Sequence, residues 1–286
     1  MLVRMVPVSN PFTPSFGAFP PCLVGRDDML TNFAYGLDNG PGALERSTLY
    51  AGSRGVGKTV MLRAAEAKAR ERGWVVITDS SREGLLENLV QTAIPEKLQL
   101  LDPDGFGKRA SHPTSAKRAV SVPTIQTLLR DLCILAEQGG TGVLLSLDEI
   151  HRSSNRDIQE VTIALQHLRG EGRNLAFVGA GLTEGLDELS NDDVKSFMRR
   201  SDRWDLGNVS LHSVQVALQQ PASEWGRPFT LEAVQLAADA TEGHPFVIQL
   251  VGSHCFRSNY GTPQIETLDA LRGIDQARQR LTALIN

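Results

Sequence analysis

One octapeptide limits the possible folds of this chain more than any other feature. Its form is G-x-x-x-x-G-K-T over residues 52–59. The apolar stretch 49–51 enters it, and the strong helix formers of residues 61–68 follow. The motif therefore lies at a strand-to-helix turn, the context that separates a phosphate-binding loop (Walker A) from a chance match.

The chemistry of phosphate binding requires these residue types. Glycines let backbone N–H groups converge on phosphate oxygens, and the N-terminus of the following helix adds positive potential. Lys58 can reach the terminal phosphates and the Thr59 hydroxyl can hold Mg²⁺. A glycine-rich turn before a surface helix would explain neither residue. We predict a nucleotide-binding loop made by Gly52, Gly55, Val56, Gly57, Lys58 and Thr59.

A second motif follows the apolar run 143–147, where Asp148 and Glu149 come some 90 residues after Lys58. A carboxylate at the end of a strand beside the phosphate loop can organise the Mg²⁺ shell, and the next one can orient the attacking water (Walker B). We assign Asp148 to the metal and Glu149 to the water. His151 completes a D-E-x-H sequence found in helicases, but those resemble two tandem motor domains, so a surface or supporting histidine is the preferred interpretation.

Length and composition bound the remaining possibilities. A chain of 286 residues can form a large core with a smaller satellite. The net charge of −4 argues against a globally basic nucleic-acid binder, so any DNA contact needs a local patch. The three cysteines are too far apart in the sequence for a zinc motif or a disulfide framework, and neither a signal-type segment nor an 18-residue apolar run occurs. We expect a soluble, cytoplasmic protein.

The hydrophobic pattern alternates between strands and helices and predicts an α/β fold with a parallel, doubly wound sheet. From about residue 208 only helical patterns follow, which predicts a small all-helical lid domain. The predicted domains are an extended, proline-rich arm (1–21), a nucleotide-binding core (22–207) and the lid (208–286). We expect strands at 47–51, 74–78, 143–149 and 175–178, core helices at 29–37, 81–100, 124–138 and 155–169, and lid helices at 211–220, 231–240, 245–256 and 263–284.

Residues 101–123 interrupt this pattern with prolines and glycines. They also carry four basic residues, Lys108, Arg109, Lys117 and Arg118. Such a segment is either a solvated insertion loop or a local nucleic-acid contact, and the sequence leaves both interpretations open.

Four segments together resemble the AAA+ ATPases, in the branch shared by origin-recognition or initiator ATPases and by STAND-type archaeal ATPases. They are the Leu-Val-Gly-Arg-Asp-Asp sequence of residues 23–28, the phosphate loop, residues 144–151, and Gly-His-Pro at 243–245. The resemblance extends over residues 20–286. It implies a AAA+ core followed by a helical lid, with ATP or ADP and Mg²⁺ as cofactors.

The resemblance also implies roles for particular residues. In such families the Val-Gly-Arg box lies near the adenine, which would place Val24, Gly25 and Arg26 in the base pocket. The segment 197–206 is similar to one that often carries an arginine reaching a γ-phosphate across a subunit interface. Arg203 is the first candidate and Arg200 the second, with an exposed basic turn as the alternative.

Two departures from the family pattern favour slow hydrolysis. The strand 175–178 is followed by Gly-Ala-Gly-Leu-Thr rather than by a polar γ-phosphate sensor, and Thr183 is the nearest substitute. The lid has His244 and Pro245 where many members carry a sensing arginine, and these two could contact nucleotide or simply begin a helix.

These features predict a Mg-ATP-dependent molecular switch with weak ATPase activity, and a homo-oligomer is one form that it could take. It could be associated with DNA through residues 101–123. The alternative is a signalling or scaffold switch that binds protein partners with little or no hydrolysis. A small-molecule kinase shares the phosphate loop, but it explains neither the helical lid nor the Val-Gly-Arg box.

Overall fold

The computed structural model describes residues 9–15, 17–103, 105, 123–188, 192–259 and 261–285. Its internal contacts divide the chain into two compact units. The first, here called the helical unit, combines Met1–Asp28, Ser53–Val60 and Leu206–Asn286. The second, the sheet unit, combines Met29–Gly52 and Met61–Asp205. The domain boundaries expected at residues 22 and 208 stay predictions.

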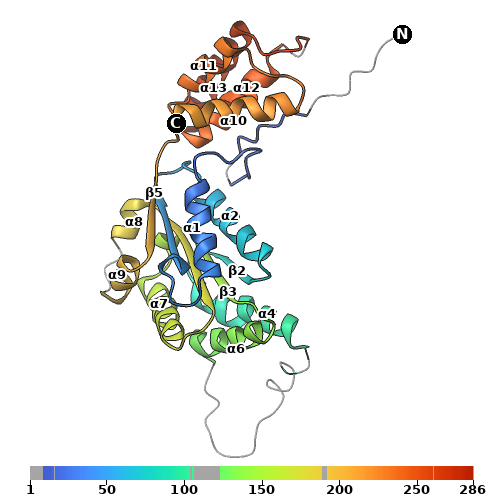
Figure 1. Cartoon of the computed structure of the whole chain (residues 1–286). Coiled ribbons are helices and arrows are strands. Elements are labelled where there is room, and N and C mark those ends of the chain that lie inside the picture. The colour runs from blue at the N-terminus through green and yellow to red at the C-terminus, as the bar shows by residue number, and fades with distance from the viewer. Residues whose placement is uncertain are drawn as a thin grey trace, which may run out of the picture. The chain divides into compact units, whose positions relative to one another are not determined.

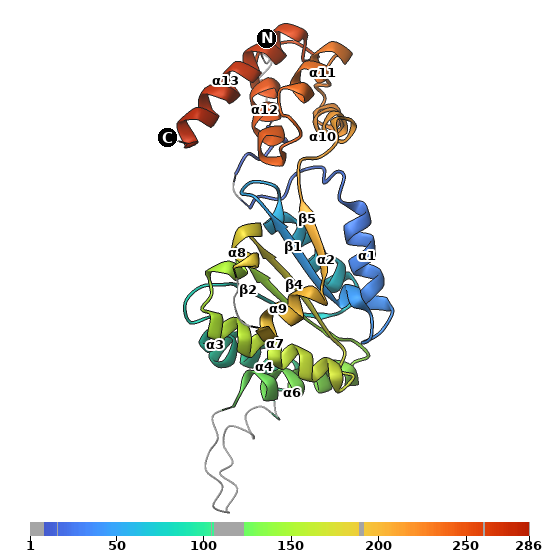
Figure 2. The same ribbon diagram turned by 90° about the vertical axis from the view of Figure 1, so that its left-hand side faces the viewer.

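The sheet unit is built on five strands in the order β2-β3-β4-β1-β5 (Figures 1 and 2). The pairs β2–β3, β3–β4 and β4–β1 are parallel, as the alternation of strands and helices predicts. The α/β fold class is therefore confirmed. The strands are β1 (Ser47–Gly52), β2 (Val75–Ser80), β3 (Val143–Asp148), β4 (Leu175–Gly181) and β5 (Asp202–Leu206).

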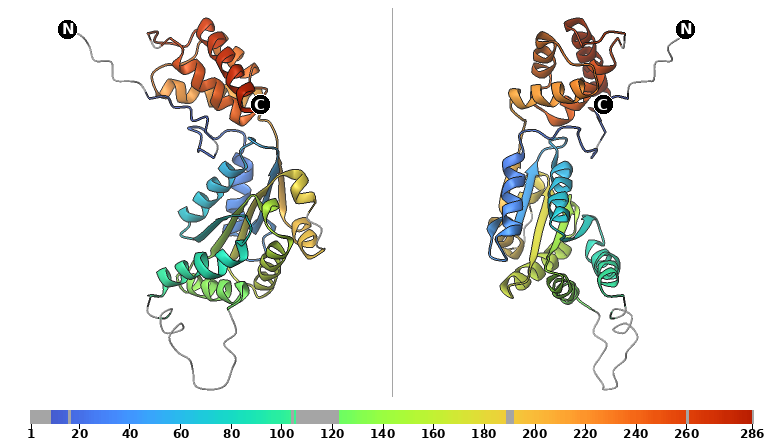
Figure 3. Two further views of the ribbon diagram at one scale, coloured as in Figure 1. Left: turned by 180° about the vertical axis from the view of Figure 1, so that it is seen from behind. Right: turned by 45° about the vertical axis from the view of Figure 1, so that its right-hand side comes forward.

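The three inner strands are apolar because both of their faces are covered. Every residue of β1 and β4 is buried, and so are the first five of β3. Side chains of one parity, such as Leu49, Leu145 and Phe177, join one hydrophobic cluster with the helices between β2 and β5. Neighbours of the other parity, such as Tyr50 and Leu144, point to the opposite face, and Figure 3 shows helices on both sides of the sheet.

The helices predicted before β5 are present, whereas the helices over residues 183–187 and 192–199 were not predicted. The α6 helix begins with a capping box, in which the Thr124 hydroxyl accepts from the Thr127 N–H, and Ser154 caps α7 in the same way through the Asp157 N–H. The helical elements are α1 (Asp27–Asp38), η1 (Leu44–Arg46), α2 (Lys58–Glu71), α3 (Leu85–Asn88), the π-helical η2 (Leu89–Ala93), α4 (Ile94–Leu101), α6 (Ile125–Gln138), η3 (Ile150–Arg152), α7 (Asn155–Gly170), α8 (Thr183–Asp187) and α9 (Asp192–Arg199).

Two predictions about this unit were wrong in detail. The helix expected to begin at Ser80 or Ser81 begins at Leu85, after Gly84 with φ 80°, and Ser80 instead ends β2 opposite Asp148. The edge strand β5 was not predicted. Three of its five residues are charged and only Leu206 is buried, so the continuous apolar run that marks the inner strands is missing.

The helical unit contains α10 (Leu211–Glu224), α11 (Leu231–Asp239), α12 (Pro245–Arg257) and α13 (Thr267–Ile285). The hydroxyls of Ser210 and Thr230 cap α10 and α11, and the predicted helices are confirmed. The buried guanidinium of Arg227 joins the end of α12 to the start of α13. It donates to the carbonyls of Ser258 and Asn259 and pairs with buried Asp269 at 3.4 Å.

Part of the proline-rich arm packs onto α12 within the helical unit. Phe12 is 3% exposed, and its ring meets Phe256 edge-to-face with centroids 6.2 Å apart. The ring lies directly over Gly252, where a Cβ atom would come within 2.5 Å of it. The described part of the arm is free of helix and strand, as its prolines predict.

Two further expectations concern the basic segment and membrane-spanning helices. Most of the basic segment, residues 104 and 106–122, lies outside them, so the contacts proposed for Lys108, Arg109, Lys117 and Arg118 stay predictions. Among the helices of the described ranges, none has the length and apolar character needed to cross a membrane.

Candidate functional site

The phosphate-loop motif forms a compact turn between β1 and α2. Gly55 and Gly57 have φ angles of 80° and 96°, in the left-handed region where a Cβ atom is strained. Val56 between them is 2% exposed and anchors the turn. A Cβ built on Gly57 meets no atom within 4 Å, so the loop presents open space at this point. Because backbone N–H groups at a helix N-terminus favour anions, this turn is a candidate phosphate-binding loop.

The lysine and threonine of the motif lie in the first turn of α2. The Lys58 ammonium donates to the carbonyl of Ser53 at 2.6 Å, so its side chain arches back over the loop. Thr59 follows it and is half-buried. A cation above a loop of backbone amides at a helix N-terminus suits a phosphate, which the Gly-rich-turn alternative does not explain.

The two acids of the second motif lie at the carboxyl end of β3. Asp148 is the last residue of the strand, and its Oδ1 accepts from the N–H of Glu149 at 2.8 Å. Glu149 adopts φ 52° and ψ 40°, a left-handed conformation that is uncommon for glutamate. Its carboxylate pairs with Arg152 at 2.5 Å, a partner that the i, i+3 spacing could have indicated. The turn thus places two carboxylates on adjacent residues at the end of the strand.

A hydroxyl and a carboxylate oxygen are ligands that Mg²⁺ prefers, so the chemistry of Thr59 and of Asp148 is compatible with the predicted metal, and their role as its ligands stays a prediction. In the described part of the chain, no group of three or more His, Cys, Asp or Glu side chains could hold an ion.

The end of β4, between β3 and β1 in the sheet, carries no polar side chain. The strand closes with Gly179, Ala180 and Gly181. The next N–H, of Leu182, donates to Nδ1 of His151 at 3.3 Å. His151 also packs closely on Gly185, where a Cβ would lie 2.5 Å from the His151 Cβ. The histidine supports the segment after β4, in agreement with the supporting role preferred from the sequence, and Thr183 is the first residue of α8.

The Val-Gly-Arg box contacts other parts of the helical unit. Val24 packs against the hydrophobic cluster of the helical unit. Gly25 has a φ angle of 64°, and a Cβ atom built on it would lie 3.2 Å from the Ser213 hydroxyl oxygen. Arg26 is 8% exposed and donates to the carbonyl of Gly207. Burial lowers the pKa of this guanidinium. These contacts give Val24 and Arg26 a structural role, and their place in a base pocket stays a prediction.

His244 and Pro245 begin α12, with Pro245 at the first helical position. His244 Nε2 lies 3.3 Å from the carbonyl oxygen of Arg54, and a Cβ on Gly55 would come 2.7 Å from its Cε1. A carbonyl only accepts, so in the neutral ring Nε2 carries the proton and Nδ1 is left as an acceptor. Nδ1 is buried and has no hydrogen-bond partner among the described residues. The lid histidine therefore contacts the phosphate loop itself.

The two candidate arginines differ in their surroundings. Arg203, on β5, pairs with Asp187 at 2.8 Å and with Asp205 at 3.2 Å, and the hydrogen bond to Asp187 raises its pKa. Arg200, directly after α9, is exposed and donates to the Ser196 hydroxyl at 3.0 Å. Asp205 lies two residues from Arg203 in the sequence, whereas Asp187 lies 16 residues from it. The pairing with Asp187 therefore follows only from the fold.

This architecture, a parallel P-loop sheet covered on both sides and followed by a helical domain, defines an α/β fold of the AAA+ type. Solved structures with this fold include RuvB of Thermotoga maritima, a Holliday junction branch migration motor. At 16% identity it aligns over 88% of this chain and 70% of its own, with a TM-score of 0.55.

Two other structures give similar values. The Walker-type ATPase paby2304 of Pyrococcus abyssi aligns at 16% identity over 92% of this chain and 73% of its own, with a TM-score of 0.58. Cdc6p of Pyrobaculum aerophilum aligns at 17% identity over 88% and 67%, with a TM-score of 0.57. At such identities the likeness concerns the fold. No family model and no curated protein matches the chain.

Proposed function

We propose that this chain binds ATP with Mg²⁺ at residues 52–59 and acts as a nucleotide-dependent switch that hydrolyses ATP slowly. The observation that carries this proposal is the geometry of the loop. Two left-handed glycines shape an open turn at the N-terminus of α2, and the Lys58 ammonium lies over a loop carbonyl. Loop amides would hold the phosphates, and Lys58 would exchange its contact with Ser53 for phosphate oxygens.

Hydrolysis would depend on the residues at the end of β3. Bound Mg²⁺ would neutralise charge on the β- and γ-phosphates, with Thr59 and Asp148 contributing oxygen ligands. Glu149, directed by its left-handed backbone, would orient and polarise the attacking water. The apolar end of β4 supports slow turnover, because only Thr183 offers a side-chain hydroxyl near the position of a γ-phosphate sensor.

An arginine from a second subunit would complete such a site. Arg200 is the better of the two candidates on energetic grounds, since Arg203 would have to leave two carboxylates to reach another molecule. Arg200 would give up one hydrogen bond to a serine hydroxyl. The particle mass with and without ATP and Mg²⁺ tests whether an oligomer forms, because an arginine acting in trans has meaning only there.

Lys58→Ala tests the nucleotide site. Loss of a charge-assisted contact should weaken ATP binding by about 10- to 100-fold. Lys68→Ala is the matched control on the same helix, since Lys68 is partly exposed and forms a surface ion pair with Glu71 at 3.1 Å. Equal ATP affinity in Lys58→Ala and the unmodified chain would refute the proposal.

We consider two proposals for the process that the switch controls. RuvB is named as a branch migration motor, and a comparable DNA association of this chain would use the basic residues of 101–123. A scaffold that binds protein partners needs no such surface and tolerates little or no hydrolysis. A DNA titration against salt distinguishes them, since phosphate contacts make affinity fall steeply as salt rises.

A further inference from the structure

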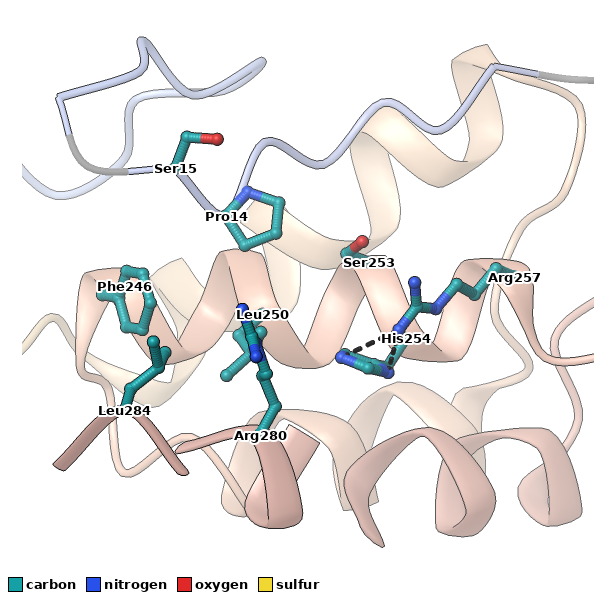
Figure 4. Close-up of a pocket in the computed structure, with 9 residues that line it drawn as sticks. All are labelled: Pro14, Ser15, Phe246, Leu250, Ser253, His254, Arg257, Arg280 and Leu284. Atoms are coloured by element: carbon teal, nitrogen blue, oxygen red, sulfur yellow. Dashed lines mark hydrogen bonds between the residues drawn. The ribbon is translucent and has the colours of Figure 1, made fainter. Parts of the chain in front are cut away.

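A cavity of about 470 Å³ lies within the helical unit, beside α12 and α13 (Figure 4). Its size falls in the range of about 300–1,000 Å³ that is typical of ligand sites. Arm residues Pro14 and Ser15 form one rim, α12 forms the floor, and the last turns of α13 close the other side. None of the residues assigned above to nucleotide or metal lines it.

The arm rim is fixed by specific hydrogen bonds. The Asn10 side chain donates to both the carbonyl and the hydroxyl of Ser253 at 3.0 Å. The N–H of Thr13 donates to the Gln249 side chain at 3.1 Å. Together with the burial of Phe12 over α12, these contacts hold the segment before Pro14 in place. The cavity is therefore bounded by well-anchored backbone on its arm side.

The cavity gathers positive charge from two arginines. Arg257 and Arg280 both line it, and neither forms an ion pair with a carboxylate of the described residues. The Arg257 guanidinium instead lies against the His254 ring, 2.6 Å from Nδ1. Burial lowers the pKa of His254, and the two arginines act in the same direction. The two guanidinium groups carry the positive charge that lines the cavity.

Apart from Ser15 and Ser253, the remaining lining residues are apolar. Phe246 and Leu250 project from α12, and Leu284, which is 43% exposed, projects from the last turn of α13. Figure 4 shows Leu284 close to Phe246, with the Arg280 side chain next to Leu250. A ligand that fills this space would bury apolar surface and place an anion beside two cations.

We propose that this cavity binds an acidic peptide segment of a partner protein, in which a carboxylate lies next to a leucine or aromatic side chain. The apolar side chain covers Phe246, Leu250 and Leu284, and the carboxylate pairs with the guanidinium groups. Nucleic acid fits less well, because phosphate-binding grooves distribute cations along the backbone path. Here two cations adjoin an apolar floor, and the chain as a whole carries a charge of −4.

The full chain can be tested with a library of random nonapeptides, followed by fluorescence anisotropy of the selected peptides. Selection should enrich peptides with Asp or Glu within two residues of Leu, Phe or Trp. Arg280→Gln should weaken their binding by about tenfold, since a charge-assisted contact is lost. Arg257→Gln should act similarly, and Leu284→Ser should weaken binding without changing its dependence on salt.

Arg278→Gln is the matched control. Arg278 lies on the exposed surface of α13, two residues before Arg280 and outside the cavity lining, so its loss should change affinity by less than about twofold. Arg257 and Arg280 are also exposed, and unchanged melting temperatures would exclude unfolding as the cause. Failure to enrich acidic peptides would overturn the proposal, and so would peptide affinities of Arg257→Gln and Arg280→Gln that equal the affinity of the unmodified chain. So would tight binding of a thymidine 20-mer that the cavity variants abolish, which would indicate a nucleic-acid site.

Discussion

Two neighbouring strands of the sheet end in opposite ways. The end of β3 carries two carboxylates on a left-handed turn, with Glu149 at φ 52°. The end of β4 carries two glycines and an alanine, and the next backbone N–H is already bonded to His151. Strained backbone with polar side chains is typical of functional sites, whereas small residues permit close packing. The difference suggests that chemistry is concentrated at β3 and that β4 serves mainly to support it.

Exchanging one polar group at each strand end should expose this difference most strongly. Glu149→Gln should lower ATP turnover by about 100-fold or more, because an amide cannot accept the proton of the attacking water. Thr183→Ala, the matched change after β4, should alter turnover by less than about threefold. Steady-state phosphate release measures both. If Thr183→Ala had the larger effect, the assignment of chemistry to β3 would be wrong.

The packing role of β4 can be tested by adding one methyl group. A Cβ on Gly179 would lie 2.3 Å from Cδ1 of Ile150 and 3.1 Å from Cδ2 of Leu49, so neighbouring side chains must shift. Gly179→Ala should reduce the free energy of unfolding by about 1–3 kcal/mol in urea denaturation. Gly170→Ala at the end of α7 meets no atom within 4 Å and should cause no loss. Equal stability of the two variants would contradict the packing argument.

The strain at β3 predicts a smaller effect of opposite sign. Glu149→Gly should raise the free energy of unfolding by about 0.5–1 kcal/mol, because glycine adopts positive φ without a Cβ penalty. The lost pairing with Arg152 limits the gain, but that arginine is 56% exposed and such pairs contribute little. Arg152→Gln isolates the loss of the ion pair. A Glu149→Gly variant less stable than Arg152→Gln would show that the turn is not strained.

The parts of the fold that the sequence predicts are those that depend on local patterns. Inner strands such as β3 are buried on both faces and therefore read as continuous apolar runs. Helix starts at Thr124 and Ser210 follow from hydroxyl caps. The strand β5 escaped prediction because an edge strand needs apolar residues on fewer positions. Its place is determined by pairing with β1, which is far away in the sequence.

The residues of the candidate site also fall into two groups: those that local sequence identifies and those that only tertiary structure brings together. The phosphate loop and the acids after β3 carry their chemistry in adjacent residues, so their spacing alone identifies them. The contact of His244 with Arg54 joins residues 190 positions apart, and the pairing of Arg203 with Asp187 depends on how α8 meets the sheet edge. Such partners follow only from tertiary structure. The cavity of the helical unit had no sequence signal, because its two arginines come from different helices.

The α12 helix connects the contact with the phosphate loop to the cavity of the helical unit. His244, the residue before its first turn, contacts the phosphate loop, and Arg257, its last residue, lines the cavity. Thirteen residues of helix correspond to about 20 Å of rigid rod. If nucleotide draws His244 away from Arg54, the rod carries that displacement to Arg257. By thermodynamic reciprocity, a peptide in the cavity would then change the affinity for nucleotide by the same factor by which nucleotide changes the affinity for the peptide.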